Sequence, residues 1–157
     1  MEADAEKDLF EQLQAEIIKD ARKVYPEKVI ERWLRPKNMG KIEDPQGFGR
    51  VTGLCGDVME MSLRVNNNRI IETKFSTMGC GPTLAAGSMA TELAAGKTVQ
   101  EAFKISQDAI LEHLGGLPEE SEHCALLASD TLKEALRNYL AYKREPWKKA
   151  YKKGLDA

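Results

Sequence analysis

The sequence predicts an α+β domain, in which a small three-stranded antiparallel sheet is covered by helices and preceded by an extra N-terminal helix. Strand-like patterns occur only between about residues 48 and 77, and helical patterns lie on both sides of them. The links between the predicted strands are too short for the crossover that a parallel pair needs. After residue 80, apolar residues recur at spacings of three and four, as in helices that cover one face of a sheet.

The first predicted helix covers residues 5–24. Its apolar residues form one narrow stripe among charged ones, and they are Phe10, Leu13, Ile17, Ala21 and Val24. A helix of about 20 residues with so narrow a stripe is not stable alone in water. We therefore expect the stripe to pack on the helix's own domain, with a second subunit of a homo-oligomer as the alternative.

The middle of the chain is predicted to hold a short helix, a loop and the three strands. Pro26 suits the first turn of the helix "PEKVIERWL", and "RPKNMGKIEDPQGFG" has the turn residues of a loop. The strands are expected at 48–54, 57–65 and 69–77. The asparagines of "NNNR" tolerate the positive φ of a tight hairpin, and a buried face is indicated by the alternating Met59, Met61, Leu63 and Val65.

The chain after Cys80 is predicted to be helical as far as a basic tail. The segment "TLAAGSMATELAAGK" is rich in small residues and should form a closely packed helix that ends near Gly96. A capping box opens the short helix "TVQEAFKI", and "SQDAILEHL" forms another helix that stops at Gly115. A long amphipathic helix follows over about 123–143, and the lysine-rich "KREPWKKAYKKG" comes after it.

Composition narrows the class of protein. The 157 residues, 42% of them apolar, suffice for one domain with a real core. The 23 basic and 25 acidic residues nearly balance, so nothing indicates nucleic-acid binding. No apolar run approaches the roughly 18 residues of a membrane span, and the N-terminus has no signal or transit pattern. We expect a cytoplasmic protein whose three cysteines are free thiols, ligands or nucleophiles rather than disulfides.

All three cysteines are predicted to lie at the ends of elements. Cys55 lies in the turn between the first two strands, Cys80 lies where the third strand gives way to a helix, and Cys124 starts the long helix. Glycine follows Cys55 and flanks Cys80 on both sides, which leaves room for a group to approach the sulfur. Because a helix N-terminus favours thiolate, we expect the pKa of Cys124 to be lowered.

Asp57 and His123 complete a candidate set of metal ligands. Asp57 lies two residues after Cys55, and His123 directly precedes Cys124. Thiolates beside imidazole and carboxylate suit zinc, or iron in a sulfide cluster. A lone cysteine is most often a small buried hydrophobic residue, and the chain has no CxxC pair. The joint occurrence therefore favours a shared site, whereas His113, with no cysteine nearby, is interpreted as structural.

Several motifs of the chain together are similar to those of a known family. They are "VIERWLRPKNMGKIEDPQGFG", "CGD", "FSTMGCG", "ATEL", "HLGGLP" and "HC", spread from about Tyr25 to Tyr142. This pattern resembles the iron–sulfur cluster assembly scaffolds of the NifU/IscU N-terminal type. The resemblance implies the α+β fold above, with the cysteines gathered at one exposed end. Residues 1–24 would then be a helical extension, 25–143 the scaffold domain and 144–157 a basic tail.

The resemblance implies a scaffold rather than an enzyme. An iron–sulfur cluster, 2Fe-2S or alternatively 4Fe-4S, would be built on Cys55, Cys80 and Cys124 from iron and the sulfur of a cysteine desulfurase. The cluster would then pass to recipient apoproteins. Zinc is the alternative occupant of the same site in the isolated protein. Cys124 would also accept persulfide sulfur. Asp57 matches the carboxylate that makes the cluster labile, and His123 matches the alternative ligand. With three thiolates, one coordination position is then left to a weaker ligand.

Two departures from the family pattern bear on partners and on the fold. Bacterial members carry an "LPPVK" motif that an Hsp70-type chaperone binds, but residues 117–121 read "LPEES" here, so that partnership is not expected. Pro82 follows "GCG" in place of a small residue, and a first helical turn tolerates it.

Two alternatives to the scaffold remain open. One is a zinc-containing sulfur acceptor for a desulfurase, and the other is a zinc-stabilised interaction module. Members of the first class carry an insertion between the second and third cysteines. The interval from Cys80 to Cys124 looks uninserted, which favours the scaffold.

Overall fold

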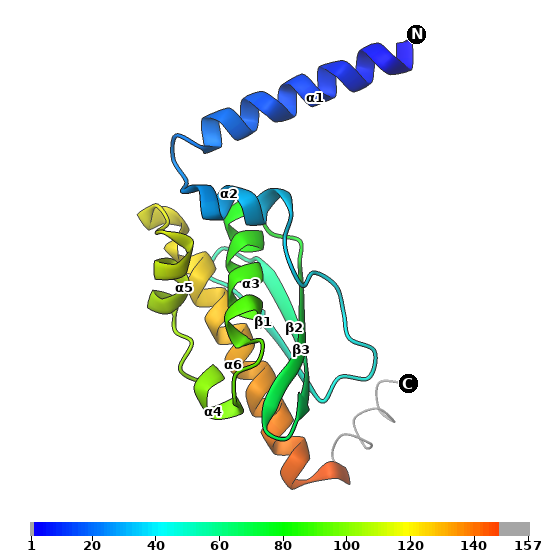
Figure 1. Cartoon of the computed structure of the whole chain (residues 1–157), viewed down its shortest axis with the longest axis vertical. Coiled ribbons are helices and arrows are strands. Elements are labelled where there is room, and N and C mark those ends of the chain that lie inside the picture. Colours follow the sequence, from blue (N-terminus) through cyan, green and yellow to red (C-terminus); the bar gives the residue numbers. More distant parts are fainter. Residues whose placement is uncertain (1, 148–157) are drawn as a thin grey trace.

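The computed structural model describes residues 2–147 (Figure 1). Its helices and strands come in the predicted order, with helices on both sides of the strands in the sequence. They are α1 (Glu2–Ala21), α2 (Glu27–Leu34), β1 (Gly47–Thr52), β2 (Val58–Asn66), β3 (Arg69–Thr77), α3 (Gly81–Ala94), α4 (Val99–Ala102), α5 (Gln107–Leu114), the 3₁₀ helix η1 (Glu119–Ser121) and α6 (Glu122–Arg144). The α+β class is confirmed.

The three strands form one antiparallel meander in the order β1-β2-β3. Met61 of β2 pairs with Gly49 of β1 on one side and with Phe75 of β3 on the other. The hairpin between β2 and β3 turns through Asn67 and Asn68, whose φ angles are 51° and 63°. These left-handed angles are why asparagine suits the turn, and they confirm the predicted hairpin.

The core lies between one face of the sheet and helices α3 and α6, which lie side by side over that face in Figure 1. Every second residue of β2 points into it, so that Met59, Met61 and Leu63 are fully buried. The small residues of α3 allow close approach: a Cβ at Gly87 would lie 2.5 Å from Cδ2 of Phe75. The sequence of α3 therefore sets how near the helix comes to the sheet.

Strand β1 packs against α6 through glycine rather than through side chains. A Cβ at Gly49 would lie 2.5 Å from the backbone nitrogen of Ala135 and 2.7 Å from the carbonyl oxygen of Thr131. Real Cβ atoms do not come so close to backbone atoms, so the two backbones touch only because position 49 has no side chain. This contact fixes the depth at which α6 lies on the sheet.

The predicted capping residues are found at the ends of α4 and α5. The Oγ1 of Thr98 accepts a hydrogen bond from the backbone N–H of Glu101 at 3.1 Å, and the Oγ of Ser106 accepts one from that of Ala109 at 3.2 Å. Gly115 ends α5 in the left-handed conformation with a φ of 86°. These caps satisfy backbone groups that helix ends leave unpaired.

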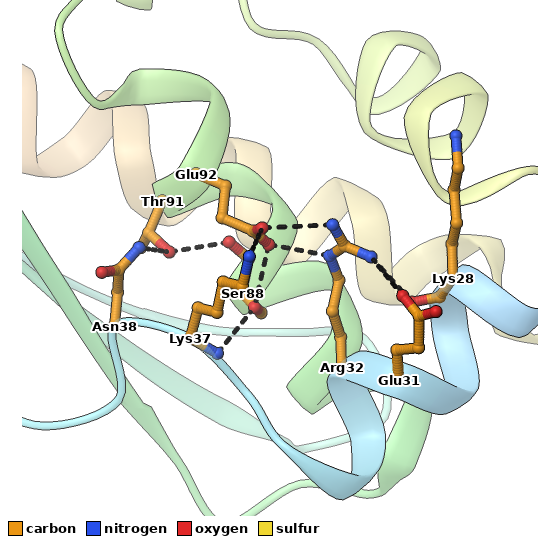
Figure 2. A network of polar contacts seen from close by, with 8 residues as sticks. All are labelled: Lys28, Glu31, Arg32, Lys37, Asn38, Ser88, Thr91 and Glu92. Carbon is orange, nitrogen blue, oxygen red and sulfur yellow. Dashed lines mark hydrogen bonds and ion pairs between the residues drawn. The ribbon is translucent and has the colours of Figure 1, made fainter.

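A polar network attaches α2 and the loop after it to α3 (Figure 2). The guanidinium of Arg32 donates to both carboxylate oxygens of Glu92, at 2.7 and 3.1 Å. Ser88 donates to the same carboxylate at 3.0 Å and accepts from the backbone N–H of Lys37 at 3.0 Å. Nδ2 of Asn38 donates to the hydroxyl of Thr91 at 3.2 Å.

The same loop covers the outer edge of β3. The carbonyl of Asn38 accepts from the N–H of Phe75 at 2.9 Å, and the N–H of Gly40 donates to the carbonyl of Phe75 at 2.8 Å. An edge strand with its backbone groups paired in this way is protected from pairing with other chains.

The expectation that α1 packs on its own domain is wrong. In Figure 1, α1 extends away from the rest of the molecule. The side chains of Phe10, Leu13 and Ile17 are 60%, 51% and 57% exposed, and Ala21 is the one buried residue of α1. The helix also ends three residues earlier than predicted, because the N–H groups of Val24 and Tyr25 both turn back to the carbonyl of Ala21. That turn directs α1 away from the core.

Two further expectations concern the ends of the chain and the membrane. Among the described residues, no helix has the length and apolar character that crossing a bilayer requires. Of the basic tail predicted at 144–157, residues 144–147 are described, and the lysines from residue 148 onward lie outside the described residues.

Candidate functional site

The three cysteines lie where the sequence places them. Cys55 is in the turn between β1 and β2, Cys80 is the N-cap residue of α3, and Cys124 is in the first turn of α6. Cys55 and Cys80 are exposed, whereas Cys124 is buried. All three are free thiols.

His123 joins the first and third cysteines. Its Nε2 lies 2.9 Å from Sγ of Cys55 and 3.7 Å from Sγ of Cys124. Either partner of each contact can hold the proton, depending on the tautomer of the ring. The imidazole therefore bridges two thiols that come from different parts of the chain.

Thr83 joins the remaining candidates. Its Oγ1 lies 3.1 Å from Oδ2 of Asp57, 3.4 Å from Sγ of Cys80 and 3.4 Å from Sγ of Cys124. Through His123 and Thr83, the structure brings all five predicted site residues into one contiguous polar cluster. Within residues 2–147, no three His, Cys, Asp or Glu side chains are yet arranged so that they could hold a metal ion.

Glycines make this convergence feasible. The turn that carries Cys55 is closed by hydrogen bonds from the Gly53 N–H to the Asp57 carbonyl at 2.7 Å and from the Gly56 N–H to the Gly53 carbonyl at 3.0 Å. Gly56 has a φ of 84°, which favours glycine, and a Cβ there would meet nothing within 4 Å. A Cβ at Gly79 would lie 3.0 Å from Oδ2 of Asp57 and 2.7 Å from Cγ2 of Thr83.

The expected lowering of the pKa of Cys124 is wrong. The pKa of its thiol is raised to about 11, chiefly by burial; the hydrogen bond from Thr83 lowers it in part, and the nearby Cys80 and Asp57 contribute to the rise. The side chain is only 2% exposed, so desolvation of a thiolate outweighs the favourable helix dipole.

Sequence reasoning did not single out Thr83. The available signal is its spacing: Thr83 follows Cys80 by three residues, and side chains three apart lie on one face of a helix. His113 was interpreted as structural, and its Nδ1 contacts the carbonyl of Ala109 at 2.8 Å, inside α5.

Pro82 and the "LPEES" segment, the two departures from the family pattern, both lie at the starts of helices. Pro82 lies in the first turn of α3, buried, where it leaves the helix intact. In "LPEES", Leu117 packs on the core, and residues 119–121 form the 3₁₀ helix that leads into α6. The carboxylates of Glu119 and Glu120 belong to exposed residues of this turn.

The cluster offers two kinds of ligand to an incoming metal. The sulfurs of Cys55, Cys80 and Cys124 are soft donors that suit zinc or iron in a sulfide cluster. The carboxylate of Asp57 and the imidazole of His123, which lie beside them, are donor types that bind such metals less tightly than thiolate does. The residues present fit a thiolate-rich site with one or two weaker positions.

Comparison with known families matches residues 24–146 to the model described as the NifU-like N terminal domain. The match covers most of the chain, and the chain belongs to the family of NifU-like N-terminal domains.

Named relatives agree with this assignment. The iron–sulfur cluster assembly scaffold protein IscU 1 of Archaeoglobus fulgidus is 48% identical over 117 residues, which are 74% of this chain and 76% of the relative. The scaffold proteins called IscU of Azotobacter vinelandii and Aquifex aeolicus are 44% and 41% identical. These alignments cover 73% and 74% of this chain, and 93% and 76% of the relatives, respectively. The family resemblance is confirmed.

Solved structures support the same fold. A NifU-like protein (N-terminal) from Brucella abortus aligns with a TM-score of 0.61 over 75% of this chain and 95% of that chain, at 19% identity. FiSufU, a protein of the SUF system from Fervidobacterium islandicum, aligns with a TM-score of 0.58 over 71% and 96%, at 26% identity. The first comparison shows the fold alone.

Proposed function

We propose that this protein is a scaffold on which an iron–sulfur cluster is assembled from iron and desulfurase-derived sulfur and then passed to apoproteins. The observation that carries the proposal is the cluster of Cys55, Asp57, Cys80, His123 and Cys124, linked through His123 and Thr83. The named relatives support it, since each is called an iron–sulfur cluster assembly scaffold protein.

The proposed ligands are the three cysteines, with Asp57 or His123 in the remaining position. A scaffold must hold its cargo and then release it. Four tight thiolates would oppose release, whereas a hard carboxylate or an imidazole leaves one exchangeable bond. The cargo is proposed to be a 2Fe-2S cluster, with 4Fe-4S as the alternative, and zinc competes for the same thiols.

Cys124 is proposed as the acceptor of persulfide sulfur. Its thiolate would attack the outer sulfur of the desulfurase persulfide, and the S–S bond there would break as the desulfurase cysteine leaves as a thiolate. A buried thiol with a pKa of about 11 is almost wholly protonated at neutral pH. Acceptance therefore requires the start of α6 to open to solvent, with His123, 3.7 Å away, placed to take the proton.

The proposed partners follow from this chemistry. A cysteine desulfurase supplies sulfur, and apoproteins receive the cluster. The "LPEES" segment, with Glu119 and Glu120 where a lysine-containing motif is usual, argues against the Hsp70-type chaperone. A zinc-containing sulfur acceptor and a zinc-stabilised interaction module are less well supported, since the relatives named above are all scaffolds for iron–sulfur clusters.

The deciding experiment is anaerobic reconstitution with iron, cysteine and a desulfurase, followed by iron and acid-labile sulfide analysis. The scaffold proposal expects both iron and sulfide in the wild type and transfer of both to an apoferredoxin. Cys55→Ser, Cys80→Ser and Cys124→Ser should each lose the cluster and keep the fold, whereas His113→Ala, the control, should assemble it normally. Zinc without sulfide would support the alternatives instead.

A further inference from the structure

Thr83 occupies a central position among the proposed ligands. Its hydroxyl oxygen lies within 3.4 Å of three ligand atoms, namely Oδ2 of Asp57 and the sulfurs of Cys80 and Cys124. The residue is fully buried in the first turn of α3. A metal ion that binds these three atoms must replace their hydrogen bonds to the hydroxyl with metal bonds of about 2.3 Å to sulfur.

The hydroxyl has one proton to share among these partners. It donates to Asp57 at 3.1 Å or to Cys124 at 3.4 Å, and its lone pairs can accept from the Cys80 thiol. One proton cannot serve both acceptors at once. The contact with Asp57 is the shorter one, and a hydrogen bond to a carboxylate is among the stronger kinds.

The backbone around Thr83 holds this arrangement in place. Gly79 has no side chain, and a Cβ there would press on both Thr83 and the Asp57 carboxylate. Gly79 also donates its N–H to Oγ1 of Thr77 at 3.1 Å, which fixes the segment just before Cys80. Asp57 can therefore reach the hydroxyl without displacing the chain.

We propose that Thr83 is a positioning residue that competes with incoming metal for Asp57, Cys80 and Cys124. Metal binding must exchange these hydrogen bonds for metal bonds, so the hydroxyl lowers the affinity of the site and favours release. This inference rests on the proposed function and names a residue that regulates the same site. It agrees with the finding that no three ligands within residues 2–147 are arranged to hold a metal while these contacts are made.

The test is a zinc titration of the full-length reduced protein under anaerobic conditions, with a chromophoric chelator as competitor. Thr83→Val removes the hydroxyl and keeps the branched shape. It should bind zinc about two- to tenfold more tightly than the wild type, the effect of losing one competing hydrogen bond. Thr83→Ser restores the hydroxyl and should return the Kd to within about twofold of the wild type.

Two further variants guard the result against a merely structural effect. Thr83→Ala also lacks the hydroxyl and should tighten zinc binding in the same direction, even if its cavity lowers the thermal midpoint. Thr131→Val is the matched control, because Thr131 is a buried threonine whose hydroxyl donates to the Leu127 carbonyl within α6 at 2.6 Å. Its zinc Kd should equal that of the wild type.

An unchanged or weaker zinc affinity in both Thr83→Val and Thr83→Ala would overturn the proposal that the Thr83 hydroxyl competes with metal. That result would leave the proposed function standing, since cluster assembly is measured separately by iron and sulfide. Conversely, a wild type that binds zinc but assembles no cluster would overturn the scaffold proposal and leave the zinc comparison interpretable.

Discussion

The sulfur of Cys55 lies 2.9 Å from Nε2 of His123, although 68 positions separate the two residues in the chain. A thiol and an imidazole at this distance form a hydrogen bond whose donor depends on the tautomer of the ring. The exposed Cys55 therefore has an imidazole beside it, and the buried Cys124 is 3.7 Å from the same nitrogen.

The first prediction concerns this contact. His123→Ala should slow alkylation of Cys55 by iodoacetamide at pH 7 by about three- to tenfold, because the thiol loses the group that takes its proton. Quantitative peptide mass spectrometry gives the rate at each cysteine. His113→Ala, which alters a histidine inside α5, should leave the rate unchanged. Equal rates in His123→Ala and wild type would contradict a functional Cys55–His123 contact.

Asp57 is predicted to make the bound cluster labile. Asp57→Ala should hold its cluster several times longer under a chelator challenge and transfer it more slowly, because the exchangeable carboxylate is gone. Visible absorbance during the challenge measures the lifetime. Asp130→Ala, an exposed acidic residue of α6, serves as the control. A variant that only loses thermal stability, with an unchanged cluster lifetime, would assign Asp57 to the turn instead.

The raised pKa of Cys124 predicts an unusual pH profile. Only the thiolate is alkylated, and a pKa of about 11 means that its fraction keeps growing through pH 9 and 10. The alkylation rate at Cys124 should rise about tenfold per pH unit from pH 7.5 to 9.5, whereas that of a free thiol levels off near its own pKa. A plateau at Cys124 below pH 9 would show that burial does not control this thiol.

Glu92 is predicted to make part of the stability depend on pH. Burial raises the pKa of its carboxyl, but the hydrogen bonds and charge of Arg32, the hydrogen bond from Ser88 and the charge of Lys37 outweigh this, so the pKa falls below the ordinary 4.5. A lowered folded-state pKa contributes stability above the unfolded pKa, and this is lost as pH falls through the folded value.

Glu92→Gln should therefore cost about 1–3 kcal/mol of unfolding free energy at pH 7, and the difference should shrink below about pH 4. Urea unfolding at a series of pH values measures it. Glu134→Gln breaks an exposed pair with Arg137 and should cost less than about 1 kcal/mol. A cost for Glu92→Gln that stays constant down to pH 3 would mean that the ion pair is not its source.

The N-terminal helix gives a prediction about assembly. Because Phe10, Leu13 and Ile17 of α1 are more than half exposed, its amides should exchange with solvent far faster than those of α3 in a monomer. Hydrogen exchange with peptide resolution, at a series of protein concentrations, measures this. Protection of α1 that grows with concentration would indicate the second-subunit alternative, whereas fast exchange throughout would exclude it over that range.

Local chemistry accounts for what the sequence predicts well. The caps at Thr98 and Ser106, the asparagine hairpin and the alternation in β2 each depend on neighbouring residues, so the pattern contains the information. The three cysteines at element ends are predictable for the same reason.

The failures concern properties that only tertiary packing decides. The stripe of α1 is apolar, but a turn at 22–25 decides where the helix points. Helix position favours a lowered pKa for Cys124, and burial by the surrounding core reverses it. Thr83 belongs to the cluster because the turn between β1 and β2 places Asp57 against it. The spacing of the two residues in the sequence does not indicate that contact.

Gly49 has no chemistry of its own, yet the place of Cys124 depends on it. The backbone of α6 rests directly on that of β1 there, at Thr131 and Ala135. Thr131 is about 10 Å along the helix from Cys124, at 1.5 Å per residue. A methyl group at position 49 would lie 2.5 Å from the backbone nitrogen of Ala135, so β1 or α6 would have to move, and a movement of α6 would shift the sulfur relative to its partners. Cluster binding should therefore be sensitive to substitution of a strand glycine that is not itself one of the proposed ligands.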